Sequence, residues 1–167
     1  MSDPHARPSD AMTTPELVWR VTQPSRVVEQ DAFTAFLDWE VKKASRLAYC
    51  VSVVSMAVDP LDRGLHGSLT ALAELMAARI RVTDLVAVIP PRFLALLLVD
   101  APTTSLQAIL GRLSSETGLV ETQTGWSAGA SCYPATAQRT NDLLQQATDL
   151  MTRAAADGGN RLYLPPT

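Results

Sequence analysis

Histidine and cysteine, the residues that most readily bind transition metals or act as nucleophiles, are scarce in this chain. The two histidines, His5 and His66, lie far apart in the sequence. The two cysteines, Cys50 and Cys132, are too few for a zinc site or a disulfide framework. We therefore expect no metal centre and no cofactor, and we expect both thiols to be buried and reduced.

A second place where chemistry would be expected is a short turn between two apolar runs, Ile89-Pro90-Pro91-Arg92-Phe93. Proline donates no backbone N–H and has a fixed φ angle, and isoleucine adds a branched side chain. A turn that approaches phosphate groups closely needs glycine, and a metal-assisted reaction needs carboxylates. This turn offers neither, so the sequence predicts a domain that regulates or binds and does not catalyse.

The spacing of apolar residues predicts the elements that position this turn. A period of three to four residues predicts helices over residues 27–48, 69–80, 106–113 and 143–154. Runs rich in Val, Leu and Ala predict strands over residues 50–58, 85–89, 93–99, 122–132 and 161–164. The resulting order is a helix, then a β-α-β-β-α-β unit, then a helix and a strand. This order predicts an α/β (α+β) fold with a ferredoxin-like antiparallel sheet and flanking helices.

The chain of 167 residues is expected to form one domain, residues 27–167, behind a flexible N-terminal tail, residues 1–26. The tail is rich in proline, serine and threonine, a composition that buries little apolar surface. Leu17–Val21 interrupts it and is interpreted either as an edge that packs on the domain or as a docking segment. Trp19 is the candidate anchor for a protein partner, whereas Trp39 and Trp126 are predicted to be packing residues.

The composition excludes several classes of function. Hydrophobic residues make up 47% of the chain, charged residues 19%, and the formal net charge is -3. An acidic chain without basic patches is not expected to bind nucleic acid or a membrane surface. No apolar run approaches the roughly 20 residues that cross a bilayer, and the N-terminus does not have the pattern of a signal peptide. We therefore expect a cytoplasmic protein without membrane insertion.

Four stretches, taken in order, resemble one known family across residues 30 to 164. They are Arg81–Val86, Arg92–Leu98, Ser127–Pro134 and the helix Leu143–Met151 with its closing Gly158-Gly159-Asn160-Arg161. Through these four stretches the chain resembles the GGDEF domain family, the diguanylate cyclases that condense two GTP molecules into cyclic di-GMP. The resemblance implies a bacterial signalling protein with a nucleotidyl-cyclase-like fold.

The same resemblance implies that the catalytic residues are missing. The family's signature hairpin supplies two glycines and two acids to GTP and metal, and Ile89–Arg92 stands in their place, with a cation at Arg92 where the family has a metal-binding acid. The family's first strand ends in an Asp-x-Asp pair whose first Asp binds metal. Asp59 can match at most one Asp of this pair, so the position of the metal-binding Asp is occupied by Ser55 or Ala57. Its Phe-Lys and Asn-Asp guanine-binding stretch is absent. The chain is therefore interpreted as a degenerate GGDEF domain, a pseudo-enzyme.

Arg81-x-x-Asp84 matches the family's inhibitory site, which binds a cyclic di-GMP dimer. An arginine fork pairs with guanine or phosphate, and a carboxylate accepts guanine N–H groups. Asp84 lies about one residue closer to the turn than in the family, and Arg79 and Arg112 are the candidates for a second arginine. The alternative interpretation is structural, with Arg81 ending a helix and Asp84 opening a strand at the surface.

Three functions remain open at this stage. The first is a regulatory or scaffolding module that acts through protein–protein contacts with an unidentified partner. The second is a cyclic di-GMP receptor that uses Arg81 and Asp84. The third is a domain that binds GTP without turnover. A homodimer is also expected, because the catalytic relatives work in pairs.

Overall fold

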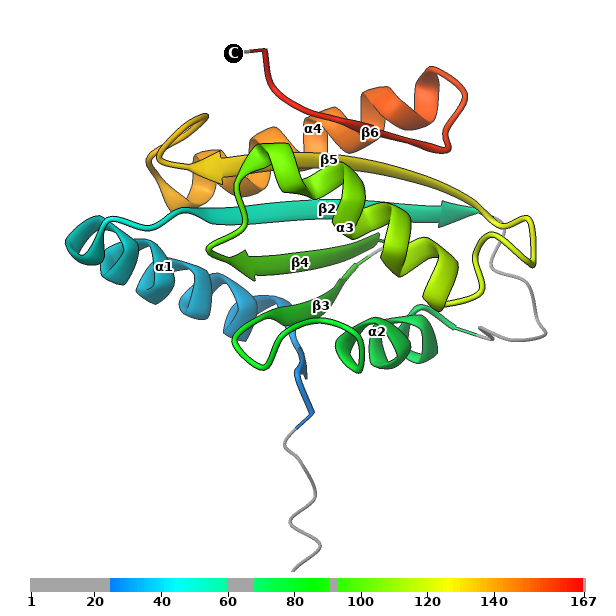
Figure 1. Ribbon diagram of the computed structural model, residues 1–167, viewed down its shortest axis with the longest axis horizontal. Coiled ribbons are helices and arrows are strands. Elements are labelled where there is room, and N and C mark those ends of the chain that lie inside the picture. The colour runs from blue at the N-terminus through cyan, green and yellow to red at the C-terminus, as the bar shows by residue number, and fades with distance from the viewer. Residues whose placement is uncertain (1–24, 60–67, 91–92, 167) are drawn as a thin grey trace, which may run out of the picture.

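A computed structural model describes residues 25–59, 68–90 and 93–166 (Figure 1). Within them the chain forms strands and helices in the order β-α-β-α-β-β-α-β-α-β. The elements are β1 (Val27–Val28), α1 (Gln30–Leu47), β2 (Val51–Asp59), α2 (Leu69–Ala77), β3 (Leu85–Ile89), β4 (Phe93–Val99), α3 (Thr103–Glu116), β5 (Gly125–Tyr133), α4 (Thr140–Ala156) and β6 (Arg161–Tyr163).

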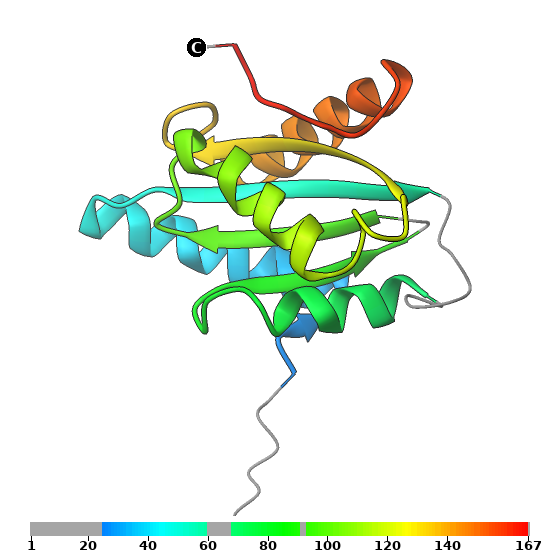
Figure 2. The same cartoon turned by 45° about the vertical axis from the view of Figure 1, so that its right-hand side comes forward.

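The strands form one six-stranded sheet in the order β1-β3-β4-β2-β5-β6. Its four central strands are antiparallel, and their order is that of a ferredoxin-like sheet, which confirms the predicted fold class. The two edge strands, β1 and β6, instead pair in parallel with β3 and β5. The turned view in Figure 2 shows the twist of this sheet between its helices.

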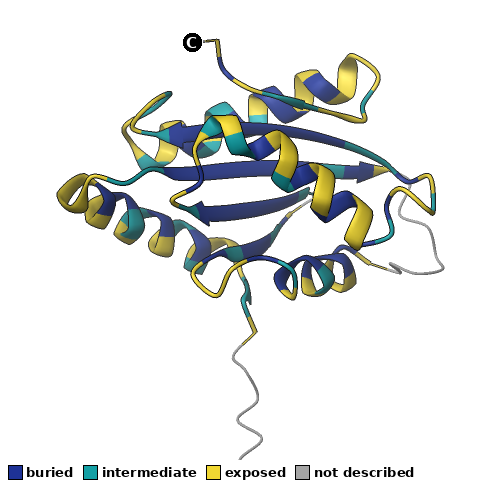
Figure 3. Cartoon of the chain, viewed as in Figure 1, coloured by how far each residue is buried: buried dark blue, intermediate teal, exposed yellow. Residues whose placement is uncertain are grey.

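Two apolar cores lie on opposite faces of the sheet, because successive side chains of a strand point to opposite faces. On β2, Val54 and Met56 face the core that α2 and α3 cover. Val51 and Val53 face the core that α1 covers together with the start of α4. Figure 3 shows the result, a buried sheet between helices whose outer faces are exposed.

The predicted boundaries differ from the observed ones where non-local pairing decides. Residues 27–28, predicted as the start of the first helix, form β1 because they pair with Val86 and Ala87 of β3. The strand predicted to begin at residue 122 begins at Gly125, since residues 117–123 form turns. The helix predicted to reach residue 80 ends at Ala77, although Ile80 is buried.

Trp39 was predicted to be a packing residue, but 66% of it is exposed and it contacts the partly exposed Phe36. The buried stripe of α1 consists of Phe33, Leu37, Val41 and Ala44, and Trp39 lies beside this stripe. Trp126 is partly buried and packs against the core under α2 and α3, as predicted.

Some of the predictions fall on residues outside the described ranges. The tail, its Leu17–Val21 segment and Trp19 precede residue 25, and Pro91 and Arg92 belong to the gap between β3 and β4. In the part of the chain that the structure describes, no helix combines the length and the apolar character that a membrane crossing requires.

Candidate functional site

The predicted signature hairpin is formed by β3 and β4, with Ile89 paired opposite Phe93. Ile89 is buried, and Phe93 packs against the same core under α1 and α4. Pro90, which follows β3, is exposed. The residues on both sides of the turn therefore belong to the apolar core.

A small hollow of about 280 Å³ lies beside the base of this hairpin, between the starts of α1 and α4. Its described lining consists of apolar and uncharged polar side chains, namely Gln30, Phe33, Thr34, Ile89, Phe93, Asn141, Leu144, Gln145 and Thr148. A site that binds Mg²⁺ and triphosphate needs carboxylates and cations within reach. The described lining supplies neither.

The end of β2 was the second place where the sequence lacks the acids of the family. Ser55 is buried, and its Oγ lies 3.2 Å from Oγ1 of Thr148 on α4. Ala57 pairs with Phe93 of the hairpin, and Asp59 is exposed at the last position of the strand. Among the described residues there is also no group of three His, Cys, Asp or Glu side chains that could hold a metal ion.

Arg81 and Asp84 lie at the opposite end of β3, in the turn that leads into it. The carboxylate of Asp84 accepts a hydrogen bond from the Val99 N–H at 3.0 Å and one from the Arg81 N–H at 3.1 Å. Only 4% of Asp84 is exposed, and burial raises the pKa of its carboxyl although these two N–H groups oppose the shift. Asp84 therefore ties the turn to β4 from the interior, which corrects the interpretation that it opens the strand at the surface.

Arginines gather where α2 ends. Arg26, which sequence reasoning did not single out, donates to the carbonyls of Ala77, Ile80 and Arg81. These carbonyls follow the last turn of α2, where a cation is favourable. Arg112 of α3 donates to the Arg79 carbonyl at 3.0 Å, so both candidate second arginines lie near this turn.

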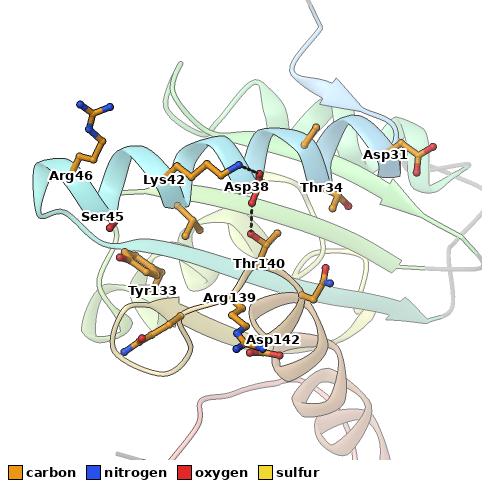
Figure 4. A pocket seen from close by; sticks show the side chains of 14 residues that line it. Asp31, Thr34, Asp38, Lys42, Ser45, Arg46, Tyr133, Arg139, Thr140 and Asp142 are labelled. Carbon is orange, nitrogen blue, oxygen red and sulfur yellow. Dashed lines mark hydrogen bonds and ion pairs between the residues drawn. The ribbon is translucent and has the colours of Figure 1, made fainter.

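A groove of about 1170 Å³ lies between α1 and the start of α4 (Figure 4). Asp38 pairs with Lys42 at 2.6 Å and accepts a hydrogen bond from Thr140 Oγ1 at 3.3 Å. The hydrogen bond from Lys42 lowers the pKa of the Asp38 carboxyl. Sequence reasoning did not single out this groove, since its two walls are about 100 residues apart in the chain and only the i, i+4 spacing of Asp38 and Lys42 marks it.

Cys50 and Cys132 lie close together, as expected from neighbouring antiparallel strands. Cys132 pairs opposite Ser52, two residues after Cys50 and on the same face of the sheet. Both thiols are free; Cys132 is buried and Cys50 is only half-buried. Burial, with contributions from Cys132 and Asp100, raises the pKa of Cys50 to about 11. A thiol with so high a pKa is a poor nucleophile at neutral pH.

The described architecture, a ferredoxin-like sheet with edge strands and four helices, defines a nucleotidyl-cyclase-like α+β domain. No protein-family model matches the sequence, and no curated protein matches it. Solved structures do match, and several of them are GGDEF domains. The GGDEF domain of YfiN from Pseudomonas aeruginosa has a TM-score of 0.67 and 22% identity, over 84% of this chain and 97% of that one.

A microbial GGDEF domain studied with cyclic di-GMP matches with a TM-score of 0.68 and 16% identity, over 83% of this chain and 94% of that one. The diguanylate cyclase SiaD from Pseudomonas aeruginosa, solved in complex with its activator SiaC, matches with a TM-score of 0.68 and 15% identity. That match covers 82% of this chain and 58% of SiaD. The chain therefore has the fold of GGDEF domains, as its four sequence stretches indicated.

Proposed function

We propose that this chain is a catalytically inactive GGDEF-like module that acts in bacterial signalling through contacts with a protein partner. The observation that carries the proposal is the uncharged described lining of the hollow beside the base of the hairpin. The described lining of the hollow beside Ile89 and Phe93 is apolar or uncharged, although Glu29 and Asp31 line a neighbouring hollow with Pro90. The resemblance places the family's metal-binding acid on Ser55 or Ala57, neither of which is a carboxylate. Phosphoryl transfer between nucleotides depends on charge stabilisation, and the side chains of this lining carry no charge.

The proposed contact with a protein rests on the fold and on one comparison. SiaD, which has the same fold, forms a complex with an activator protein. The proposal extends this ability to bind a protein to the present chain, which matches 58% of SiaD. A protein partner is therefore the first candidate ligand.

The test of inactivity is incubation of the full chain with GTP and Mg²⁺, followed by chromatography of the nucleotides. We expect no cyclic di-GMP above a protein-free control, with an active diguanylate cyclase as the positive control. Calorimetric titration with GTP addresses the alternative of binding without turnover, for which heat without product is the expected result. Any cyclic di-GMP formed by the purified chain contradicts the proposal.

A cyclic di-GMP receptor is the second candidate. It is favoured by the arginines around the end of α2, because Arg81 is exposed and Arg79 and Arg112 lie near it. Against it, both oxygens of Asp84 already accept backbone N–H groups, so guanine would have to replace an internal bond.

Calorimetry with cyclic di-GMP separates the two candidates. A receptor binds with a dissociation constant below about 100 μM, which corresponds to roughly 5 to 6 kcal/mol, and Arg81→Ala abolishes the binding. The matched control is Arg46→Ala, an exposed arginine at the end of α1, which leaves binding unchanged. The absence of heat with the wild-type chain rules out the receptor and leaves the protein-contact module.

A further inference from the structure

An apolar groove of about 550 Å³ lies between α1 and the beginning of β3, and Lys42 separates it from the groove in Figure 4. The aromatic side chains of Phe36 and Trp39 form its outer wall, and Leu85 and Leu97 contribute from the sheet. We call it the aromatic groove. Phe36 is 42% exposed and Trp39 is 66% exposed.

The two aromatic rings of this groove are held in place. Phe36 and Trp39 meet edge to face, with ring centroids 6.3 Å apart, which is a favourable arrangement of aromatic rings. The one carboxylate in the lining, Glu40, is neutralised by Lys43 at 2.7 Å and accepts a hydrogen bond from Tyr49. The groove therefore presents apolar surface, and an apolar segment is the occupant that suits it.

The chain joins the sheet at the rim of this groove. The Arg26 carbonyl accepts a hydrogen bond from the Val86 N–H at 3.0 Å, next to Leu85 in the groove lining. Neighbouring strands are about 4.8 Å apart, so Arg26 lies close to the rim. The side chain of Arg26 fixes this position through the carbonyls of Ile80 and Arg81, which lead to Thr83 in the same lining.

The residues that precede this junction contain one apolar run, Leu17-Val18-Trp19-Arg20-Val21. Trp19 is six residues before Ser25, and a chain of that length spans roughly 20 Å when extended. The run is therefore long enough to reach the groove around the edge of the sheet from Ser25, whose hydroxyl donates to Glu74 of α2.

The short linker also favours a segment of the same chain over a second copy of the protein as the occupant of the groove. A short linker gives its segment an effective concentration of about millimolar, which exceeds that of a second copy in dilute solution. We propose that the segment Leu17–Val21 of this chain lies in the aromatic groove, with the Trp19 side chain against Phe36 and Trp39. This inference goes beyond the proposed function, because it describes the chain in the absence of a partner.

The test uses the indole N–H signals of the full chain in nitrogen–proton NMR spectra. The chain has three tryptophans, so the Trp19→Ala and Trp39→Ala variants assign the three signals. We expect Trp19→Ala to shift the Trp39 indole signal and the amide signals of residues 36–43 and 83–85. Trp39→Ala is expected to shift the Trp19 signal in turn. Trp39 is mostly exposed and Trp19 belongs to the N-terminal tail, so we expect both variants to fold.

Two controls are built into this experiment. The Trp126 signal, from the start of β5, stays unchanged in both variants. Met12→Ala, in the N-terminal tail before the segment Leu17–Val21, leaves the Trp39 signal unchanged. An unshifted Trp39 signal in Trp19→Ala overturns the proposal. If the difference in the Trp39 signal between the wild-type chain and Trp19→Ala disappears when both samples are diluted, a second copy occupies the groove. This result also overturns the proposal.

Discussion

At the scale of single residues, Asp84 combines burial with a structural charge. Its two oxygens accept N–H groups from Val99 and Arg81, which joins the turn before β3 to the end of β4. We expect Asp84→Asn to lower the free energy of unfolding by about 1–2 kcal/mol, because one of the two N–H groups then faces an amide that cannot accept. Chemical denaturation monitored by circular dichroism measures this loss.

The loss depends on pH, and its sign follows from the raised pKa of Asp84. A folded-state pKa above the ordinary value means that the folded protein binds the proton more tightly than the unfolded chain. The stabilisation by protonated Asp84 is therefore complete below the ordinary pKa of aspartate and is lost as the pH rises through the raised value. The destabilisation by Asp84→Asn is accordingly larger in acid than at neutral pH. If the destabilisation by Asp84→Asn instead grew with rising pH, the pKa of Asp84 would be lowered in the folded protein and not raised.

Cys50 gives a prediction about reactivity. Its pKa rises from 9.0 to about 11, chiefly through burial, and two pKa units reduce the thiolate fraction by roughly 100-fold. We expect alkylation of Cys50 by iodoacetamide at pH 8 to be slower than that of a free thiol by this factor, as measured by mass spectrometry. Asp100→Asn, which removes a nearby negative charge, accelerates the reaction. The denatured chain serves as the control and reacts at the ordinary rate.

At the scale of elements, the contact between α4 and β5 depends on one glycine. A methyl group at Gly129 would overlap the backbone of α4 at Ala147 and Met151 and would lie 2.6 Å from Leu150 Cβ. We expect Gly129→Ala to lower the free energy of unfolding by about 3 kcal/mol or more, since a helix backbone cannot move away cheaply. Thermal unfolding measures the effect.

Gly111 is the matched control for this substitution. It lies in α3, and no atom is found within 4 Å of a methyl group added there. Gly111→Ala is expected to raise the free energy of unfolding by about 0.5–1 kcal/mol, because alanine favours the helix. If both substitutions had the same sign, contact with α4 would not be the reason for glycine at position 129.

The sequence predicted elements well where local pattern decides. The limits of β3 and β4, Leu85–Ile89 and Phe93–Val99, agree with the predicted strands because each apolar run ends at a polar residue or a proline. β1 was not predicted, since two valines form a strand only when β3 lies beside them. Contacts between residues distant in sequence also explain why parts of the candidate site were not predicted. The capping role of Arg26 and the burial of Asp84 depend on residues that are distant in sequence.

At the scale of the whole molecule, the sheet carries two cores that share every central strand. β2 contributes Val54 and Met56 to one core and Val51 and Val53 to the other. A loss of packing on either face therefore disturbs the same strands. Both faces of the sheet are packed, while the hollow beside the hairpin is lined by apolar and uncharged side chains among the described residues.

This arrangement predicts that the two faces unfold together. Leu37 of α1 and Leu106 of α3 are both fully buried, on opposite sides of the sheet. We expect Leu37→Ala and Leu106→Ala each to cost about 2–5 kcal/mol and each to leave one cooperative transition, with coincident curves from near- and far-ultraviolet circular dichroism. Leu47→Ala, at a residue that is 70% exposed, is the control and changes stability by less than about 0.5 kcal/mol. Two separate transitions in either core variant would mean that one face keeps its packing after the other is lost, and that the shared strands do not couple the two cores.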